Sequence, residues 1–158
     1  MDKILNLSAF GEDIKPSQNQ PTFVPNNTEK TEPNHGKVLS MILQNISQTK
    51  LLHWQSLKYG QHKALDELFE GLIDLGDTLA ESMMGKYGRP VLNESDLCLN
   101  LRNFEDPENK DLTEFTTAIY LFYSGECKEM FSKDPELLNI IEEILGLIDK
   151  IKYLLTLK

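Results

Sequence analysis

The sequence has no apolar run approaching the roughly 20 residues that a membrane-spanning helix requires. Its first residues, MDKILNLSAFGEDIKPSQNQ, also lack the sustained apolar stretch and small-residue cleavage site of a secretory signal. Cysteine is scarce: Cys98 and Cys127 have no metal-ligand spacing and are too few for a disulfide scaffold, so we interpret them as reduced thiols. These absences predict a cytoplasmic protein with no membrane partner.

Positive charge is also in short supply. The 158 residues carry 16 Lys and Arg against 25 Asp and Glu, a formal net charge of -9. Such a chain repels phosphate at long range, so we expect no sequence-independent binding to nucleic acid or anionic lipid. The length suits one domain, and 40% hydrophobic residues suffice for one core.

Residues 1–36 differ in composition from the rest of the chain. They are rich in proline, asparagine, serine and threonine, as in KPSQNQPTFVPNNTEKTEPNHG, which is typical of turns and of segments without a packed core. We predict a flexible N-terminal arm over 1–36 and a folded domain over 37–158.

Apolar residues recur at steps of three and four throughout the folded domain, which predicts amphipathic helices. Breakers separate them: Gly60 ends the first helix, Gly88 and Pro90 the second, and Asp134 with Pro135 opens the last. No alternating strand pattern competes. The predicted helices span 37–58, 61–86, 111–130 with Asp111 as N-cap, and 134 to the C-terminal residues.

The connections between these helices predict the topology. Two are short and make their helices antiparallel neighbours, whereas the one after residue 86 has roughly 20 residues, enough to cross the bundle, with a short helical turn around Glu94–Leu101. The predicted fold is an all-α, ferritin-like antiparallel four-helix bundle with one long crossover that carries a short helix.

The helix over 61–86 carries a candidate metal site. At about 100° per residue, His62, Asp66, Asp77 and Glu81 fall within about 100° of one another, on one face. Histidine with carboxylates suits iron, manganese or zinc. However, Asp66 and Asp77 are eleven residues apart, about 16 Å along a helix, which is too far for one metal.

A two-fold axis would remove this difficulty. The pairs His62 with Glu81 and Asp66 with Asp77 are both symmetric about the point between Gly71 and Leu72. Two such helices crossing antiparallel there would complete two identical sites, and Gly71 would allow their close approach. His53, near the end of the preceding helix, reaches the same end of the bundle as His62.

Simpler interpretations exist for each residue. Charged residues on a helix face usually form only a solvated surface, and His62 with Asp66 is an ordinary pair four residues apart. His35, within Glu32-Pro33-Asn34-His35, imitates the Glu-x-x-His pattern of di-iron bundles, but we interpret it as a chance match in a loop. The joint symmetry of both pairs favours the metal site.

The His53-Trp54 pair followed by Gly60, then His62-x-x-x-Asp66 and Asp77-Thr-Leu-Ala-Glu81-Ser, resembles the signature of the Dps mini-ferritins, over roughly residues 40–158. The resemblance implies iron sites formed by His53, His62, Asp66, Asp77 and Glu81, shared across dimer two-folds of a hollow dodecamer. It further implies oxidation of ferrous iron by peroxide or oxygen and storage of the ferric product, which protects against oxidative stress.

Three functional hypotheses follow. The first is this iron-oxidising, iron-storing protein, in the cytoplasm of a bacterial host if it is phage-encoded. The second is a ferritin-like structural or interaction protein without catalysis, such as a phage-encoded relative. The third is a simple helical dimer with a solvated acidic face. The arm is not lysine-rich, so the family's DNA binding is not expected here.

Overall fold

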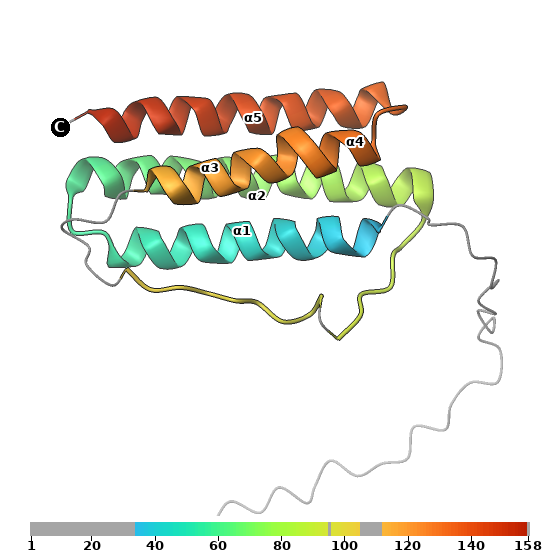
Figure 1. The fold of residues 1–158 in the computed structure, drawn as a ribbon, viewed down its shortest axis with the longest axis horizontal. Coiled ribbons are helices and arrows are strands. Elements are labelled where there is room, and N and C mark those ends of the chain that lie inside the picture. Colours follow the sequence, from blue (N-terminus) through green and yellow to red (C-terminus); the bar gives the residue numbers. More distant parts are fainter. Residues whose placement is uncertain (1–33, 95, 105–111, 158) are drawn as a thin grey trace, which may run out of the picture. The chain divides into compact units, whose positions relative to one another are not determined.

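The computed structural model describes residues 34–94, 96–104 and 112–157, and every regular element in them is a helix (Figure 1). The all-α class is therefore confirmed, while residues 1–33 of the predicted arm lie outside the described residues. The elements are α1 (His35–Gln55), α2 (Tyr59–Tyr87), α3 (Thr113–Phe122), the π-helical turn η1 (Tyr123–Cys127), α4 (Lys128–Met130) and α5 (Pro135–Thr156).

The helices pack through the apolar stripes that the periodicity predicts. Helix α2 contacts both α1 and α5, and α3 and η1 contact α5. The long apolar pattern of α5 is explained by these several neighbours, because a helix that is packed on more than one side needs a wider apolar face. Fully buried side chains of the core include Val38, Leu68, Leu72, Leu79, Met83, Tyr123, Phe131, Ile141, Ile144 and Ile148.

The turn between α1 and α2 differs from the expectation. Tyr59 and Gly60 lie in the first turn of α2, and the break falls at Ser56–Lys58, where Ser56 and Lys58 are extended. The prediction that Gly60 ends a helix is therefore wrong. The break lies earlier because His62 N–H donates to the Lys58 carbonyl (2.9 Å), so that α2 already begins before Gly60.

The other predicted helix ends agree well with the structure. Gly88, with φ of 82°, caps α2 in a left-handed conformation that suits glycine. Asp134 is the N-cap of α5 and Pro135 its first residue, as expected. Asp111, the expected N-cap before α3, lies outside the described residues.

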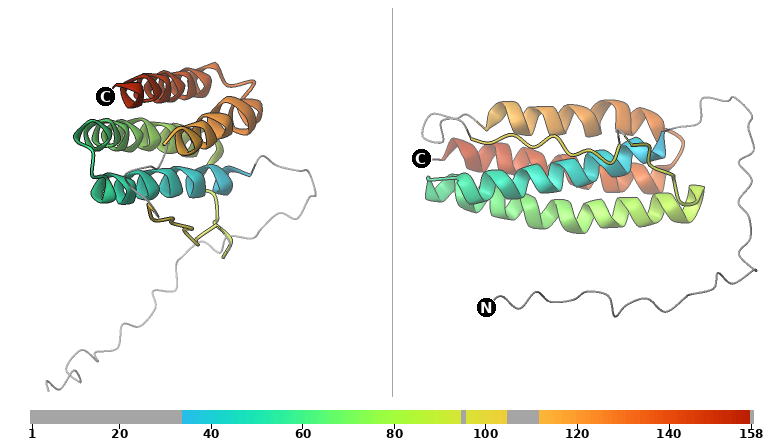
Figure 2. Two further views of the ribbon diagram at one scale, coloured as in Figure 1. Left: turned by 60° about the vertical axis from the view of Figure 1, so that its left-hand side comes forward. Right: turned by 90° about the horizontal axis from the view of Figure 1, so that it is seen from below.

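The connection between α2 and α3 differs from the prediction that it carries a short helix. Its described residues, 88–94 and 96–104, contain turns at Glu94, Asp96 and Leu97 and no helix. From Cys98 the chain instead runs along α1 (Figure 2). The short helix predicted around Glu94–Leu101 is therefore wrong in these residues, and the reason lies in side chains of α1.

Three glutamines of α1, here called the glutamine ladder, hydrogen-bond this connection. Gln44 accepts from the N–H of Asn100 (2.8 Å) and donates to its carbonyl (2.9 Å). Gln48 does the same with Arg102 (2.7 and 2.8 Å). Gln55 accepts from Phe104 N–H (2.8 Å). The carboxamides thus replace the bonds that a helix would have made within the segment.

The glutamine ladder is possible because the spacing along the helix matches the spacing along the extended chain. Four residues of a helix rise about 6 Å, and two residues of an extended chain span about 6.6 Å, so Gln44 and Gln48 stay in register with Asn100 and Arg102.

In the part of the chain that the structure describes, no helix has the length and apolar character needed to span a membrane.

Candidate metal centre

The histidines at the α1–α2 turn form a reciprocal pair. His53 lies in the last turn of α1, His62 lies in the first turns of α2, and their rings stack with centroids 4.0 Å apart. His53 Nδ1 lies 3.2 Å from the carbonyl of His62, and His62 Nδ1 lies 3.1 Å from the carbonyl of His53. We call this arrangement the histidine pair.

The histidine pair assigns the tautomer of both rings. A carbonyl oxygen can only accept a hydrogen bond, so each Nδ1 carries the proton and donates. In the neutral ring, the lone pair available to a metal is then the one on Nε2. Histidines that bind metals generally donate their other nitrogen to a carbonyl or carboxylate in this way. His53 is buried and His62 is half-buried.

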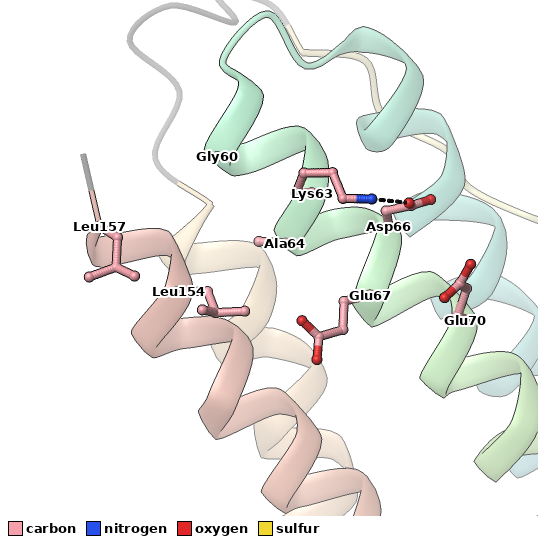
Figure 3. Close-up of a pocket in the computed structure, with 8 residues that line it drawn as sticks. All are labelled: Gly60, Lys63, Ala64, Asp66, Glu67, Glu70, Leu154 and Leu157. Atoms are coloured by element: carbon pink, nitrogen blue, oxygen red, sulfur yellow. Dashed lines mark hydrogen bonds and ion pairs between the residues drawn. The ribbon is translucent and has the colours of Figure 1, made fainter.

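Asp66, one turn along α2 from His62, lies beside the histidine pair. Its Oδ1 lies 3.7 Å from His53 Nδ1, and its Oδ2 accepts a hydrogen bond from Lys63 Nζ at 2.9 Å (Figure 3). This bond from Lys63 lowers the pKa of Asp66, and the charges of Lys63 and His53 act in the same direction. Asp66 is therefore an ionised carboxylate at neutral pH, held by a lysine.

Asp66 also lines a surface hollow that no sequence pattern indicated. The hollow, of about 440 Å³, lies between the start of α2 and the end of α5 (Figure 3). Carboxylates dominate its polar lining, since Glu67 and Glu70 join Asp66, while Leu154 and Leu157 come from the α5 side. Glu67 is paired with Lys150 of α5, which ties the two helices together at this end.

Asp77 and Glu81 lie apart from this group. Both are exposed, on the outward face of α2 and three to four turns beyond Asp66. Across residues 34–94, 96–104 and 112–157 of one chain, no three His, Cys, Asp or Glu side chains are arranged so that they could hold a metal ion together. One chain thus places Asp66 next to the histidine pair without closing a metal site, and it leaves the other two predicted ligands elsewhere.

Gly71 does not occupy the position expected of it. A Cβ at Gly71 would lie 2.5 Å from Cδ2 of Leu147, so this glycine faces α5 of its own chain. The physical reason is its position about 180° around the helix from His62, well away from the face of Asp66 and Asp77. The prediction that Gly71 lies at a crossing with a second copy is therefore wrong.

The exposed face of α2 nevertheless has an apolar component next to its carboxylates. Ile73, about midway along the helix between Asp66 and Glu81, is 39% exposed. Phe69 lies beneath Lys50 of α1, whose Nζ is 4.2 Å from the ring centroid. The face is therefore mixed, with acidic and large apolar side chains together.

His35 lies far from the histidine pair in the sequence and in the bundle. It is the first residue of α1, not a loop residue, and its ring packs on Tyr87 (4.5 Å between centroids) and on Phe131 (5.8 Å). The Glu32 of the imitated motif lies outside the described residues. This environment is aromatic packing where α1 begins and α2 ends.

Fold and site together define an all-helical protein with a histidine pair at its first interhelical turn and a carboxylate beside it. The chain belongs to DUF5856, a family of unknown function, which matches residues 53–155. The matched stretch begins at His53 and contains all five predicted ligands. No curated protein and no solved structure matches the chain.

Proposed function

We propose that this protein is a ferritin-like, Dps-type iron protein of the cytoplasm. It binds ferrous iron at sites shared between two copies of the chain, oxidises it with peroxide or oxygen, and stores the ferric product. The observation that carries the proposal is the histidine pair, because the carbonyl of each residue keeps the proton of the other ring on Nδ1 and leaves Nε2 as the metal donor.

The donor set suits iron. Imidazole nitrogen and carboxylate oxygen together bind ferrous iron, and zinc or manganese are other divalent ions that such donors accept. Carboxylates favour the more highly charged ferric product. Asp66 is the nearest carboxylate of the same chain, and Lys63 holds only its Oδ2, which leaves Oδ1 for the metal.

A second copy supplies the missing ligands. With two α2 helices antiparallel about Gly71–Leu72, Asp77 and Glu81 of one copy would face His62 and Asp66 of the other. Ile73 lies close to this centre on the exposed face and provides the apolar contact there, in place of Gly71. We extend the same reasoning to a ferritin-like topology with one long crossover and to a dodecameric shell.

The oxidation balances in electrons. Two ferrous ions each give one electron to one molecule of hydrogen peroxide, whose O–O bond breaks, and both oxygens leave as water or hydroxide after taking up protons. The role of the five predicted ligands in this step is to hold two ions near each other and to stabilise the added charge. The role of the shell is to keep the ferric product in solution.

The test combines mass and iron oxidation on the full chain. We expect an assembly larger than a dimer that binds ferrous iron stoichiometrically, at about two sites per dimer, and oxidises the bound iron when peroxide is added. Asp66→Ala and Glu81→Ala should each reduce the rate at least tenfold, whereas Glu143→Ala, on the exposed side of α5, should not change it. Equal rates in all three variants would exclude the proposed site.

A second candidate is a ferritin-like structural or interaction protein without catalysis. The observation in its favour is that the Asp66 carboxylate is already paired with Lys63 and that the described part of one chain holds no complete metal group. This candidate predicts normal assembly of metal-free protein and no ferrous oxidation. Lys63→Ala separates the two, because freeing Asp66 should speed oxidation in an iron protein and change nothing in the other.

A further inference from the structure

The glutamine ladder leaves one edge of the 98–104 segment without partners. In an extended chain, the N–H and carbonyl of successive residues point to opposite edges. Asn100 and Arg102 direct theirs at α1, so those of Leu99, Leu101 and Asn103 point away from it. Among the described residues, none of these outward backbone groups makes a hydrogen bond.

The side chains of residues 98–102 alternate as they do in a β-strand. Cys98, Asn100 and Arg102 line a hollow of about 620 Å³ between α1, α3 and the segment, with Leu52, Phe115 and Ile119 among its apolar lining. The leucines between them do not line it. Leu99 and Leu101 are instead 42% and 45% exposed, and Leu97, in the turn just before the segment, is 64% exposed. The opposite face of residues 98–102 is thus formed by Leu99 and Leu101.

Proteins usually protect such edges. Lysine, proline or a covering loop normally prevents an open edge from pairing with another chain. Residues 98–104 contain no proline and no lysine, and Arg102 is their one charged residue. Among the described residues nothing pairs with this edge, and exposed leucines lie next to it, which favours pairing with another chain.

We propose that residues 98–104 pair, edge to edge and antiparallel, with the same segment of a second copy. The partner is a second copy because Leu99-Asn100-Leu101 reads the same in both directions, so that antiparallel copies centred on Asn100 place leucine opposite leucine. Pairing centred on Asn100 places Leu99 opposite the Leu101 of the other copy, twice. It also places each Arg102 opposite Cys98, so the two arginines do not meet.

This pairing uses different residues from the α2 contact of the proposed function and does not depend on iron. The outward N–H and carbonyl groups of Leu99 and Leu101 would form two reciprocal pairs of hydrogen bonds across the two-fold axis. The leucines, which would lie opposite one another on one face, would contact each other instead of water.

Disulfide trapping in the full chain tests the register. In a Cys98→Ser background, Asn100→Cys would place two thiols at a non-hydrogen-bonded pair, about 4.5 Å apart at Cα, within the range that a disulfide bridges. The matched control Arg102→Cys would place them four residues out of register, about 14 Å apart. Neither substitution removes a side chain of the glutamine ladder.

We expect mild oxidation to convert most of the Asn100→Cys protein to a covalent dimer linked at residue 100, and at least tenfold less of the Arg102→Cys protein. Leu101→Pro removes the backbone N–H of residue 101, which points away from α1. Added to the Asn100→Cys protein, it should reduce the yield of covalent dimer to that of the Arg102→Cys control, whereas Leu101→Ala should not. Equal yields at 100 and 102, or equal yields with proline and alanine, would overturn the proposal.

Discussion

Gly76 lies where α2 packs closely against Ile42 of α1. A Cβ there would lie 2.9 Å from Cγ2 of Ile42, a buried β-branched side chain that has little freedom to move. On α5, by contrast, a Cβ at Gly146 would have no neighbour within 4 Å. Two glycines inside helices thus have opposite physical surroundings.

Gly76→Ala should therefore lower the free energy of unfolding, and Gly146→Ala should raise it. Overpacking costs about 1–3 kcal/mol, against a gain of about 1 kcal/mol in helix propensity, which leaves a net loss of about 1 kcal/mol for the first variant. Gly146→Ala has only the gain in helix propensity, because its Cβ meets no neighbour. Urea unfolding of both variants measures the difference, and equal stabilities would mean that the helices do not pack closely at Gly76.

The two cysteines should differ in reactivity. Cys98 is exposed, whereas Cys127 is fully buried in η1, and burial raises the pKa of its thiol to about 12. Only about one Cys127 in ten thousand would be thiolate at pH 8, and the thiolate is the reactive form. Ellman's reagent should therefore titrate one thiol per native chain and two in denaturant. Two fast thiols in the native protein would contradict the burial of Cys127.

At the scale of elements, the glutamine ladder decides the path of the connection. Gln48→Met keeps the length of the side chain but removes both hydrogen bonds to Arg102. Each bond contributes about 0.5–1.5 kcal/mol, so the Arg102 amide should exchange with deuterium roughly tenfold faster.

The Asn100 amide is the internal control, because Gln44 still accepts its hydrogen bond. Faster exchange at Arg102 with little change at Asn100 would confirm that each glutamine holds its own residue. Unchanged exchange at both amides would mean that the segment is held by something other than the ladder.

Sequence reasoning found the helices and missed this segment for one physical reason. The step of three and four residues between Val38, Ile42 and their successors is local, so a helix and its buried face can be predicted from it. The bonds of Gln44 join it to a residue 56 positions away. Glutamines on a helix face usually indicate solvent, and nothing nearby in the sequence distinguishes these.

At the scale of the whole molecule, the site could be predicted in part. The short turn made it possible to place His53 beside His62, and the structure brings both together next to Asp66. The role of Gly71 could not be predicted, because a helical wheel gives a direction but does not say which neighbour lies there. The contribution of Asp77 and Glu81 from a second copy stays a prediction.

The ends of three helices meet in a cluster that should govern stability in acid. Asp134, at the start of α5, is buried and accepts hydrogen bonds from Lys86 and Tyr87 at the end of α2, while His35 of α1 acts on it through its charge. The bond from Lys86, then that from Tyr87, lowers the pKa of Asp134. Lys86 also pairs with Glu136 and lowers its pKa.

The sign of the pH dependence follows from these directions. A carboxyl whose pKa is lower in the folded than in the unfolded chain stabilises the fold above its unfolded value, about 3.9 for aspartate, and loses that contribution as the pH falls through the folded value. The melting temperature should therefore drop steeply below about pH 4, where Asp134 and Glu136 become protonated and release Lys86.

Asp134→Asn tests this assignment, since asparagine still caps a helix but has no charge to lose. The variant should melt at a lower temperature than the native chain at pH 7, and the gap should narrow between pH 5 and pH 3. The control Asp74→Asn, on the exposed face of α2, should follow the native chain at every pH. Asp134→Asn could instead lose as much stability between pH 5 and pH 3 as the native chain does. The acid sensitivity would then reside in other carboxylates. The cluster would join the helix ends through the packing of His35, Tyr87 and Phe131 alone.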